Sequence, residues 1–305
     1  MNPRDVRIGI IAAALSTDAR QVPRLARQLG FDGLLFDAYS PTLSLPDLSQ
    51  SGRREFRHVL SAESRQLVGL RADLGAKGLT PGVDVDRVLS LLTKAMEAAA
   101  GLQAPLLCTD LGPLPTPPAE PKPVKRATPE MAGLILLPNP IEEPPAPPAA
   151  APATMSPADV ALAAQVDAVL RELGARAERF GVTVAFRSDL SALAALERAL
   201  RGAACPWFGV DLDPVATLRD EWPLDEILSR LGPLIRHVRG RDANRGAGGR
   251  TSPAVIGVGS VKWPELLSNL DAAGYHGWIT VDPMELPDRS AAAAAAVAVL
   301  RPASS

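Results

Sequence analysis

The chain has 305 residues, a formal charge of −2 and 4% aromatic residues. A chain of this length can bury a large core, and it fits one α/β barrel better than two average domains. The balanced charge gives no electrostatic reason to expect binding to nucleic acid or to an acidic membrane surface. No apolar segment is long enough to cross a bilayer.

Two features of the sequence bear on the cellular compartment. Cys108 and Cys205 each lie in or beside an apolar run, which favours core thiols in a reducing compartment over a disulfide. Arg4 and Arg7 precede an apolar run at residues 8–15 that resembles a short signal-peptide core. The alternative is that residues 6–12 form the first strand of a barrel, which could not close without that strand. We therefore expect a cytoplasmic protein, with a signal peptide as the alternative.

The first half of the chain alternates short apolar runs with segments of helical periodicity. Predicted strands cover residues 6–12, 31–36, 68–70 and 104–108, and predicted helices cover residues 53–67 and 85–99. Another helix follows Asp18, which suits an N-terminal cap, and it stops at Gly30. The pattern predicts repeated strand–helix units.

Residues 112–157 interrupt this alternation. They contain about half of the 30 prolines of the chain. Proline lacks the amide donor and fixes φ, so neither a helix nor a central strand can run through such a segment. We expect an extended or partly disordered insertion after the fourth strand. Its apolar island at residues 131–137 either packs on the barrel or forms an arm that covers the site or joins subunits of a homo-oligomer.

Regular alternation then resumes. Ser156 caps a predicted helix over residues 157–180, and Gly181 ends it. Further strands are predicted at residues 182–186, 208–212, 234–238 and 278–281, with helices at 190–200, 223–231, 263–270 and 291–300. A Gly/Arg-rich loop without periodicity follows the strand at 234–238. Eight strand–helix units predict one closed (β/α)₈ TIM barrel over residues 1–305.

Polar residues stand where the predicted strands end, and the carboxyl ends of barrel strands are where such folds hold their sites. They are Asp37, Arg71, Asp110, Arg187, Asp213, His237, Arg239 and Asp282. Side chains alternate along a strand, so Asp211 shares a face with Asp213, and Thr280 with Asp282; His237, Arg239 and Arg241 likewise share one. A polar ligand, including an anionic one, suits a single pocket that contains carboxylates, guanidinium groups and an imidazole.

The last quarter of the chain has a recognisable order of features. A strand containing His237 is followed by a long loop, the segment Gly257-Val-Gly-Ser-Val-Lys-Trp263, a helix, the segment Gly274-Tyr-His-Gly277, and a strand ending in Asp282. This order resembles the xylose-isomerase-like TIM-barrel superfamily, which includes sugar-phosphate isomerases and epimerases, ketose epimerases, inosose dehydratases and endonuclease-IV-type enzymes. Three histidines are too few for the multi-zinc site of the last branch, which disfavours DNA repair.

The resemblance implies one divalent ion, Mn²⁺, Zn²⁺ or Mg²⁺, held by glutamates of the fifth and eighth strands with an aspartate and a histidine between them. Here Arg187 stands where the first glutamate is expected, and Ala216 replaces a histidine that is common there. Asp213, His237 and Asp282 remain as a possible three-ligand set. Because the positive charge of Arg187 would repel a cation nearby, we regard the ligand set as degraded and favour the absence of metal.

Two functions remain open. The first is a sugar-phosphate or sugar isomerase or epimerase that transfers a proton next to a carbonyl, with Asp282 and Asp213 as acid and base and His237 polarising an oxygen. The predicted substrate-binding residues are Arg187, Arg239, Asp37, Asp110 and Arg71. The alternative is a non-catalytic barrel that binds a small anionic sugar or serves as a partner module.

Two of these polar residues have a purely structural alternative. Arg187 can form a salt bridge across the barrel mouth, and His237 can be a hydrogen-bonded core histidine. Asp242 is expected to brace the loop after the seventh strand rather than to take part in chemistry.

Overall fold

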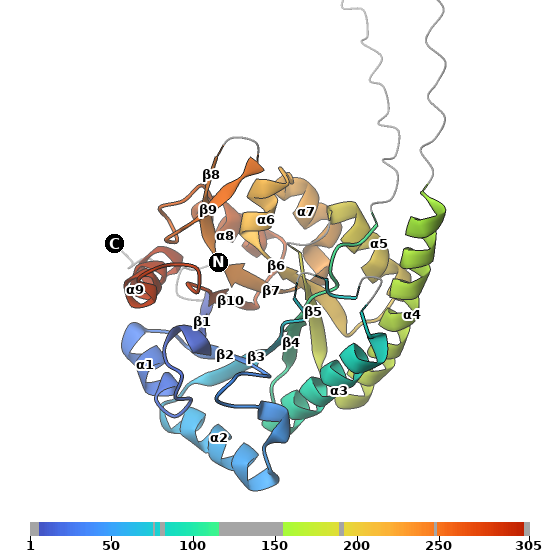
Figure 1. The fold of residues 1–305 in the computed structure, drawn as a ribbon. Helices are drawn as coiled ribbons and strands as arrows, with labels where there is room; N and C mark the ends of the chain where they lie inside the picture. The colour runs from blue at the N-terminus through green and yellow to red at the C-terminus, as the bar shows by residue number, and fades with distance from the viewer. Residues whose placement is uncertain are drawn as a thin grey trace, which may run out of the picture.

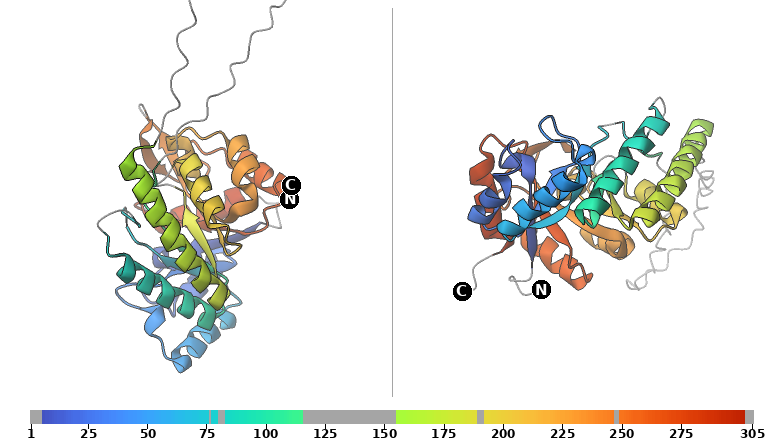
Figure 2. Two further views of the ribbon diagram at one scale, coloured as in Figure 1. Left: turned by 90° about the vertical axis from the view of Figure 1, so that its right-hand side faces the viewer. Right: turned by 90° about the horizontal axis from the view of Figure 1, so that it is seen from below.

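A computed structural model describes residues 6–75, 77–79, 83–115, 155–188, 192–246 and 249–301. Parallel strands close into a barrel in the order β1-β10-β7-β6-β5-β4-β3-β2, and helices surround it (Figure 1, Figure 2). The pairing of β1 with β10 closes the ring, with Arg7 opposite Trp278. The predicted (β/α)₈ barrel is confirmed.

The barrel strands are β1 (Arg7–Ile11), β2 (Gly33–Asp37), β3 (Gln66–Ala72), β4 (Leu106–Thr109), β5 (Thr183–Arg187), β6 (Phe208–Leu212), β7 (Ile235–Gly240) and β10 (Trp278–Val281). The helices are α1 (Val22–Leu29), α2 (Gln50–Ala62), α3 (Val85–Leu102), α4 (Pro157–Phe180), α5 (Leu193–Ala203), α6 (Pro214–Arg219), α7 (Leu224–Leu231), α8 (Trp263–Ala272) and α9 (Arg289–Leu300). A separate antiparallel hairpin consists of β8 (Asp242–Arg245) and β9 (Thr251–Ala254).

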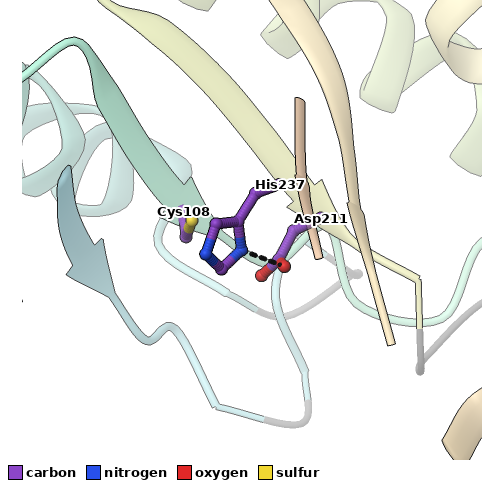
Figure 3. A group of neighbouring side chains, drawn as sticks. All are labelled: Cys108, Asp211 and His237. Carbon is purple, nitrogen blue, oxygen red and sulfur yellow. Dashed lines mark hydrogen bonds and ion pairs between the residues drawn. The ribbon is translucent and has the colours of Figure 1, made fainter. Parts of the chain in front are cut away.

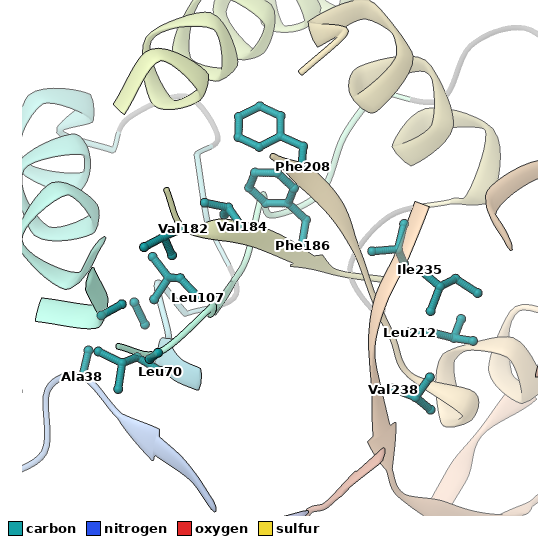
Figure 4. Close-up of a cluster of buried hydrophobic side chains, with 14 of the residues drawn as sticks. Ala38, Leu70, Leu107, Val182, Val184, Phe186, Phe208, Leu212, Ile235 and Val238 are labelled. Atoms are coloured by element: carbon teal, nitrogen blue, oxygen red, sulfur yellow. The ribbon is translucent and has the colours of Figure 1, made fainter. Parts of the chain in front are cut away.

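The larger part of the core lies between the barrel and its helices. Outward-facing strand residues such as Val184, Phe186 and Phe208 are buried there (Figure 4). The rings of Phe186 and Phe208 meet edge to face, with centroids 5.1 Å apart and planes at 78°. This layer attaches β5 and β6 to the helices, so that the ends of both strands are held in place.

The interior of the barrel is apolar toward its floor. A second buried cluster consists of the inward-facing residues Ile11, Leu35, Val68, Leu106, Cys108, Ala185 and Trp278. The indole of Trp278 fits because Gly33 lacks a side chain, since a Cβ there would lie 2.8 Å from the indole ring. The closed floor leaves the carboxyl ends of the strands as the open end of the barrel.

Helix ends agree with the sequence in the second half better than in the first. Ser156 caps α4 by accepting a hydrogen bond from Asp159 N at 3.1 Å, and Gly181 ends it in the left-handed conformation, both as predicted. The predicted cap Asp18 is wrong, because its carboxylate accepts from Arg20 N in the turn before α1. Helix α2 begins earlier than predicted, at the residue after its cap Ser49.

The Gly/Arg-rich loop after β7 contains the hairpin β8–β9, which the sequence did not reveal. The carboxylate of Asp242 organises it by accepting hydrogen bonds from the amides of Ala243, Gly257 and Val261 and from Trp263 Nε1. A Cβ at Gly259 would overlap Asp242 Oδ1. The Gly-Val-Gly segment therefore lets the backbone approach this carboxylate, and Asp242 braces the loop as expected.

Residues 116–154 lie outside the described part of the chain, so the Pro-rich insertion, its island at 131–137 and a subunit contact through it remain predictions. Cys108 and Cys205 are both free thiols. Among the helices described, none combines the length and apolarity needed to cross a membrane.

Candidate active site

The polar site lies at the carboxyl ends of the barrel strands. Cys108 and Ala185 face the barrel interior, so Asp110 and Arg187, two residues further along, face the mouth above them. The same alternation on the neighbouring strands brings Asp211, His237, Arg239 and Thr280 inside, where all are at most 5% exposed. The strand-end residues therefore converge at the mouth as predicted. Below them, a further layer of buried polar side chains lies inside the barrel.

The deepest polar contact links three strands. His237 Nδ1 lies 2.6 Å from Asp211 Oδ1 (Figure 3). His237 Nε2 lies 2.7 Å from Thr280 Oγ1. Both ring nitrogens therefore have a partner, and the imidazole is fully buried. This is the hydrogen-bonded core histidine that was the structural alternative for His237.

Arg239 lies above this pair on β7. Its Nε donates to Asp211 Oδ2 at 2.7 Å, so one buried carboxylate serves both His237 and Arg239. Burial alone would raise the pKa of Asp211, but the charges of Arg239 and His237 and their hydrogen bonds hold it well below its ordinary value. Asp211 is thus a buried carboxylate that stays ionised.

Asp213 is held by Arg241 and by the start of α6. Arg241 Nη1 donates to Asp213 Oδ2 at 2.6 Å, and Arg241 Nη2 donates to Glu285 Oε1 at 2.8 Å. The other oxygen, Asp213 Oδ1, accepts from Val215 N at 3.0 Å and so caps α6. Both oxygens of Asp213 are occupied, and this carboxylate is fully buried.

The outer rim contains two further ion pairs. Arg71 Nε donates to Asp37 Oδ1 at 2.6 Å, and Arg71 Nη1 lies 3.5 Å from Asp282 Oδ2. Arg187 Nε lies 2.5 Å from Asp110 Oδ1, which is the salt bridge that was the structural alternative for Arg187. These pairs and the inner ones form a ring in which each of Arg71, Arg187, Arg239 and Arg241 contacts a carboxylate.

A cavity of about 350 Å³ opens at one side of the ring. Asp37 and Met284 are among its lining residues, together with Phe36 and Ser40. Asp37 binds Arg71, and Met284 N donates to Asp282 Oδ1 at 3.2 Å. The cavity therefore meets the ring at Asp37, while Arg71 and Asp282 lie behind its lining, and its volume is large enough for a small molecule.

The residues at the mouth do not fit the divalent ion that the resemblance implies. Asp213 is engaged by Arg241 and by the backbone, and both nitrogens of His237 are engaged by Asp211 and Thr280. Asp282 lies beside Arg71, and the position of the missing glutamate holds Arg187. Fixed positive charges thus surround the place where the ion would need free carboxylate and imidazole lone pairs.

Among the described residues, one group of three has metal-ligand spacing. Ligand atoms of Cys108, Asp211 and His237 lie within 4.8 Å of one another (Figure 3). Burial raises the pKa of the Cys108 thiol well above its usual range, and the negative charge of Asp211 raises it further. A protonated thiol is a poor ligand, and Asp211 already binds both His237 and Arg239, so this group also does not suit an ion.

The closed parallel barrel, with polar side chains gathered above the strand ends, is a (β/α)₈ barrel. The chain belongs to the family described as the xylose isomerase-like TIM barrel, which it matches over residues 23–303. No curated protein matches the chain.

Solved structures similar to this one cover almost all of the chain. A xylose isomerase domain protein from Planctomyces limnophilus has a TM-score of 0.69 at 16% identity, over 97% of this chain and 95% of its own. A 3-keto-D-glucoside 4-epimerase from E. coli has a TM-score of 0.65 at 18% identity, over 97% of this chain and 99% of its own. A D-psicose 3-epimerase from Clostridium cellulolyticum, solved with D-tagatose, has a TM-score of 0.68 at 16% identity, over 97% of this chain and 98% of its own. At these identities the likeness establishes the fold.

The predicted site residues fall into several separate contact groups in the structure. Asp37, Arg71 and Asp282 form one contact chain at the rim, and Asp110 pairs with Arg187. Asp213, His237 and Asp282, the predicted metal ligands, do not form a group with metal-ligand spacing among the described residues. Asp211, Arg241 and Glu285 were missing from the predicted set; the alternation that placed Asp211 beside Asp213 was the signal for the first of them.

Proposed function

We propose that the protein is a sugar isomerase or epimerase that transfers a proton next to a carbonyl without a divalent ion. The observation that supports this proposal is the arrangement of Asp37 and Asp282 around the single guanidinium of Arg71, beside a cavity of about 350 Å³. The family and the epimerases among the similar structures support the same class of substrate.

Each group has a role in the proposed chemistry. The carboxylate of Asp282 removes the proton from the carbon next to the substrate carbonyl, and this carbon–hydrogen electron pair moves toward the carbonyl oxygen. The guanidinium of Arg71 donates hydrogen bonds to that oxygen as its negative charge develops. Asp37, which accepts from Arg71 Nε, takes up a proton from water and delivers it to the carbon from a second direction, while the proton on Asp282 passes to water; epimerisation requires these two directions.

The ring also bears on the substrate. Arg71, Arg187, Arg239 and Arg241 all have carboxylate partners, so their charges are balanced within the protein. Mixed carboxylate and guanidinium groups hydrogen-bond well to hydroxyl groups, whereas a phosphate would compete with the carboxylates for the same cations. We therefore propose an uncharged sugar rather than a phosphorylated one.

Solvent isotope exchange tests the proposed reaction. Ketoses and aldoses are incubated with the protein in D₂O containing EDTA, and NMR follows deuterium at the carbon next to the carbonyl. We expect exchange with at least one sugar, and Asp282→Asn should slow it by about 100-fold or more. Asp220→Asn, the same change at a pair with Arg219 near the surface, should have no effect. Exchange that stops in EDTA, or that survives Asp282→Asn unchanged, contradicts the proposal.

A second candidate is a barrel that binds a sugar without turning it over. It is favoured by the balanced ring, because ion pairs at 2.5 to 2.8 Å hold most of its carboxylates away from any substrate. Saturable binding of a sugar by calorimetry, with no deuterium exchange for that same sugar, would select this candidate over the enzyme.

A further inference from the structure

We infer that a second site, on the outside of the barrel, binds the phosphate group of a small ligand. It is a cavity of about 270 Å³ whose lining residues are Gln50, Arg53, Arg54, Arg57 and Gly101. Four of them belong to α2, and Gly101 belongs to the end of the neighbouring helix α3 (Figure 1). None of them is part of the ring of ion pairs or lines the cavity beside it. This arginine cavity is therefore separate from the proposed active site.

The protein does not balance the charge of the arginine cavity. Among the described residues, no carboxylate forms an ion pair with any of its three arginines, whereas each arginine of the ring contacts one. Glu55 of α2 pairs instead with Arg20, before α1, at 2.7 Å. Glu63, the C-terminal cap of α2, pairs with Arg27 of α1 at 3.2 Å. The acidic groups of this helix thus interact with the α1 side, and three positive charges line the cavity toward α3.

These charges lie close together on one helix. Arg53 and Arg57 are four residues apart, and Arg54 and Arg57 are three apart, so their side chains are neighbours on the surface of α2. Like charges at this spacing repel each other and weaken a helix. The arrangement therefore opposes the stability of α2 unless an anion lies among the guanidinium groups.

Two donors of the cluster have no acceptor in the described structure. The Nε atoms of Arg53 and Arg57 are buried, and neither forms a hydrogen bond with the described residues. A buried donor without an acceptor is unfavourable, because it loses its contact with water and gains nothing in exchange. The oxygen atoms of an oxyanion bound by these side chains would supply acceptors.

Gly101 leaves room for one of the guanidinium groups. A Cβ at this position would lie 2.5 Å from Arg53 Nη1 and 3.2 Å from Arg53 Cδ. Glycine is a poorer helix former than alanine, yet it stands within the last turn of α3. The absence of a side chain therefore lets the end of Arg53 lie against α3, where it forms one wall of the cavity.

The size and charge of the cavity indicate its ligand. Guanidinium groups bind phosphate oxygens through paired hydrogen bonds, and three of them are enough to balance a phosphate dianion. The volume of about 270 Å³ lies below the about 300–1,000 Å³ typical of sites for drug-sized molecules, so it suits a phosphate group with at most a small organic part. A nucleic acid needs a longer row of cations, and the chain has a formal charge of −2.

Calorimetry and thermal shift with the full chain test the inference, with inorganic phosphate and glycerol 3-phosphate as probes. Chloride at the same ionic strength is the reference. We expect one phosphate group to bind per chain, and a probe at roughly 100 times its Kd should raise the Tm by about 4 °C. Tighter binding of glycerol 3-phosphate would identify the ligand as a phosphate ester, and tighter binding of inorganic phosphate would identify it as free phosphate.

Three variants assign the binding to the cavity. Arg53→Gln and Arg57→Gln each remove one guanidinium and should weaken phosphate binding by about 10-fold or more. Arg236→Gln is the matched control, because Arg236 is an exposed arginine on β7 whose Nη1 donates to Pro233 O at 2.8 Å. It removes the same charge from another part of the surface and should keep the wild-type affinity.

Gly101→Ala tests the shape of the cavity without changing any charge. The added Cβ would displace the guanidinium of Arg53, so phosphate binding should weaken by about threefold or more. Alanine also favours the helix, so we expect this variant to fold. Unchanged binding by Gly101→Ala would overturn the inference, because positive charge alone would then explain the binding.

Two other results would overturn it. One is wild-type protein that responds to phosphate no more than to chloride. The other is an affinity of Arg53→Gln and Arg57→Gln equal to that of Arg236→Gln, with wild-type circular dichroism for all three. If an arginine variant does not fold, Arg54→Gln replaces it, because the side chain of Arg54 is exposed. None of these readouts depends on deuterium exchange, so they decide this inference independently of the proposed reaction.

Discussion

Arg71 and Asp282 face each other across the rim at 3.5 Å, while the other ion pairs of the ring span 2.5 to 2.8 Å. Asp282 is therefore the ring carboxylate held most loosely by its cation. It also accepts a hydrogen bond from the amide of Met284 at 3.2 Å. A ligand oxygen can enter between Arg71 and Asp282 with less loss of existing interactions than elsewhere in the ring.

We expect Arg71 to act on the developing negative charge rather than on ground-state binding. Arg71→Ala should lower the rate of isotope exchange by about 100- to 1000-fold with a smaller change in apparent KM, and Arg71→Lys should recover part of that rate. Exchange rates at several sugar concentrations measure both quantities. A loss confined to KM would assign Arg71 to binding alone.

Asp242 should be important for stability although it takes no part in the proposed chemistry. Each of its oxygens accepts two hydrogen bonds, and the residue is 4% exposed. Asp242→Ala leaves these buried donors without partners and should lower the free energy of unfolding by about 3–4 kcal/mol. Asp242→Asn keeps one acceptor oxygen and should cost less. Urea unfolding orders the variants, and equal losses would contradict this account.

The floor of the barrel should not tolerate a methyl group at Gly33. A Cβ there would lie 2.7 Å from Val68 Cγ2 and 2.8 Å from the Trp278 ring. Gly33→Ala should therefore destabilise the protein by about 1–3 kcal/mol and shift the tryptophan fluorescence. Gly202→Ala is the matched control, because the nearest atom to its Cβ would be Asp167 Oδ1 at 4.0 Å and the residue lies within α5. Alanine is the better helix former, so this control should be neutral or slightly stabilising.

Glu197 should make the protein more stable above acidic pH. It accepts from Arg201 Nε at 3.0 Å within α5 and from Arg230 Nε at 2.7 Å on α7. Burial raises the pKa of Glu197, but the hydrogen bonds from the two arginines outweigh it and lower the pKa below the ordinary value. A folded-state pKa below the unfolded one means stability that is present above about pH 4.3 and is lost as the pH falls through the folded value.

The variant Glu197→Gln isolates this contribution. It should lower the free energy of unfolding by about 1–2 kcal/mol at pH 7. The difference from wild type should shrink as the pH falls from about 5 toward 3, which urea unfolding at several pH values measures. A difference that is the same at all pH values would show that the charge of Glu197 does not contribute.

The alternation of apolar runs and helical periodicity was enough to predict the barrel. Strand ends were also predictable, because side chains alternate and barrel strands all end at one mouth. The hairpin β8–β9 was not, since its residues are mostly exposed or intermediate and its order depends on the carboxylate of Asp242, which binds amides well beyond the hairpin. Helix α6 has six residues, too few for a periodic pattern.

The role of Asp211 depends on strand register, which the sequence does not show. The pairing of β6 with β7 shifts between Val210 and Asp211, and this shift brings Asp211 opposite His237. From the sequence alone, Asp213 was grouped with the seventh-strand histidine as a possible metal ligand. The structure instead pairs Asp213 with Arg241, two residues further along than Arg239.

The closure of β1 on β10 has a consequence for how the chain folds. One edge of β1 stays unpaired until β10, which comes after every other barrel strand, has been synthesised and has docked beside it. Contacts between such distant parts of a chain form slowly, and an open strand edge attracts other chains in the meantime. Arg301 then fastens the closed ring by donating to Val6 O at 2.8 Å. During synthesis the unpaired edge of β1 therefore exposes the chain to aggregation, and pairing with β10 removes this exposed edge.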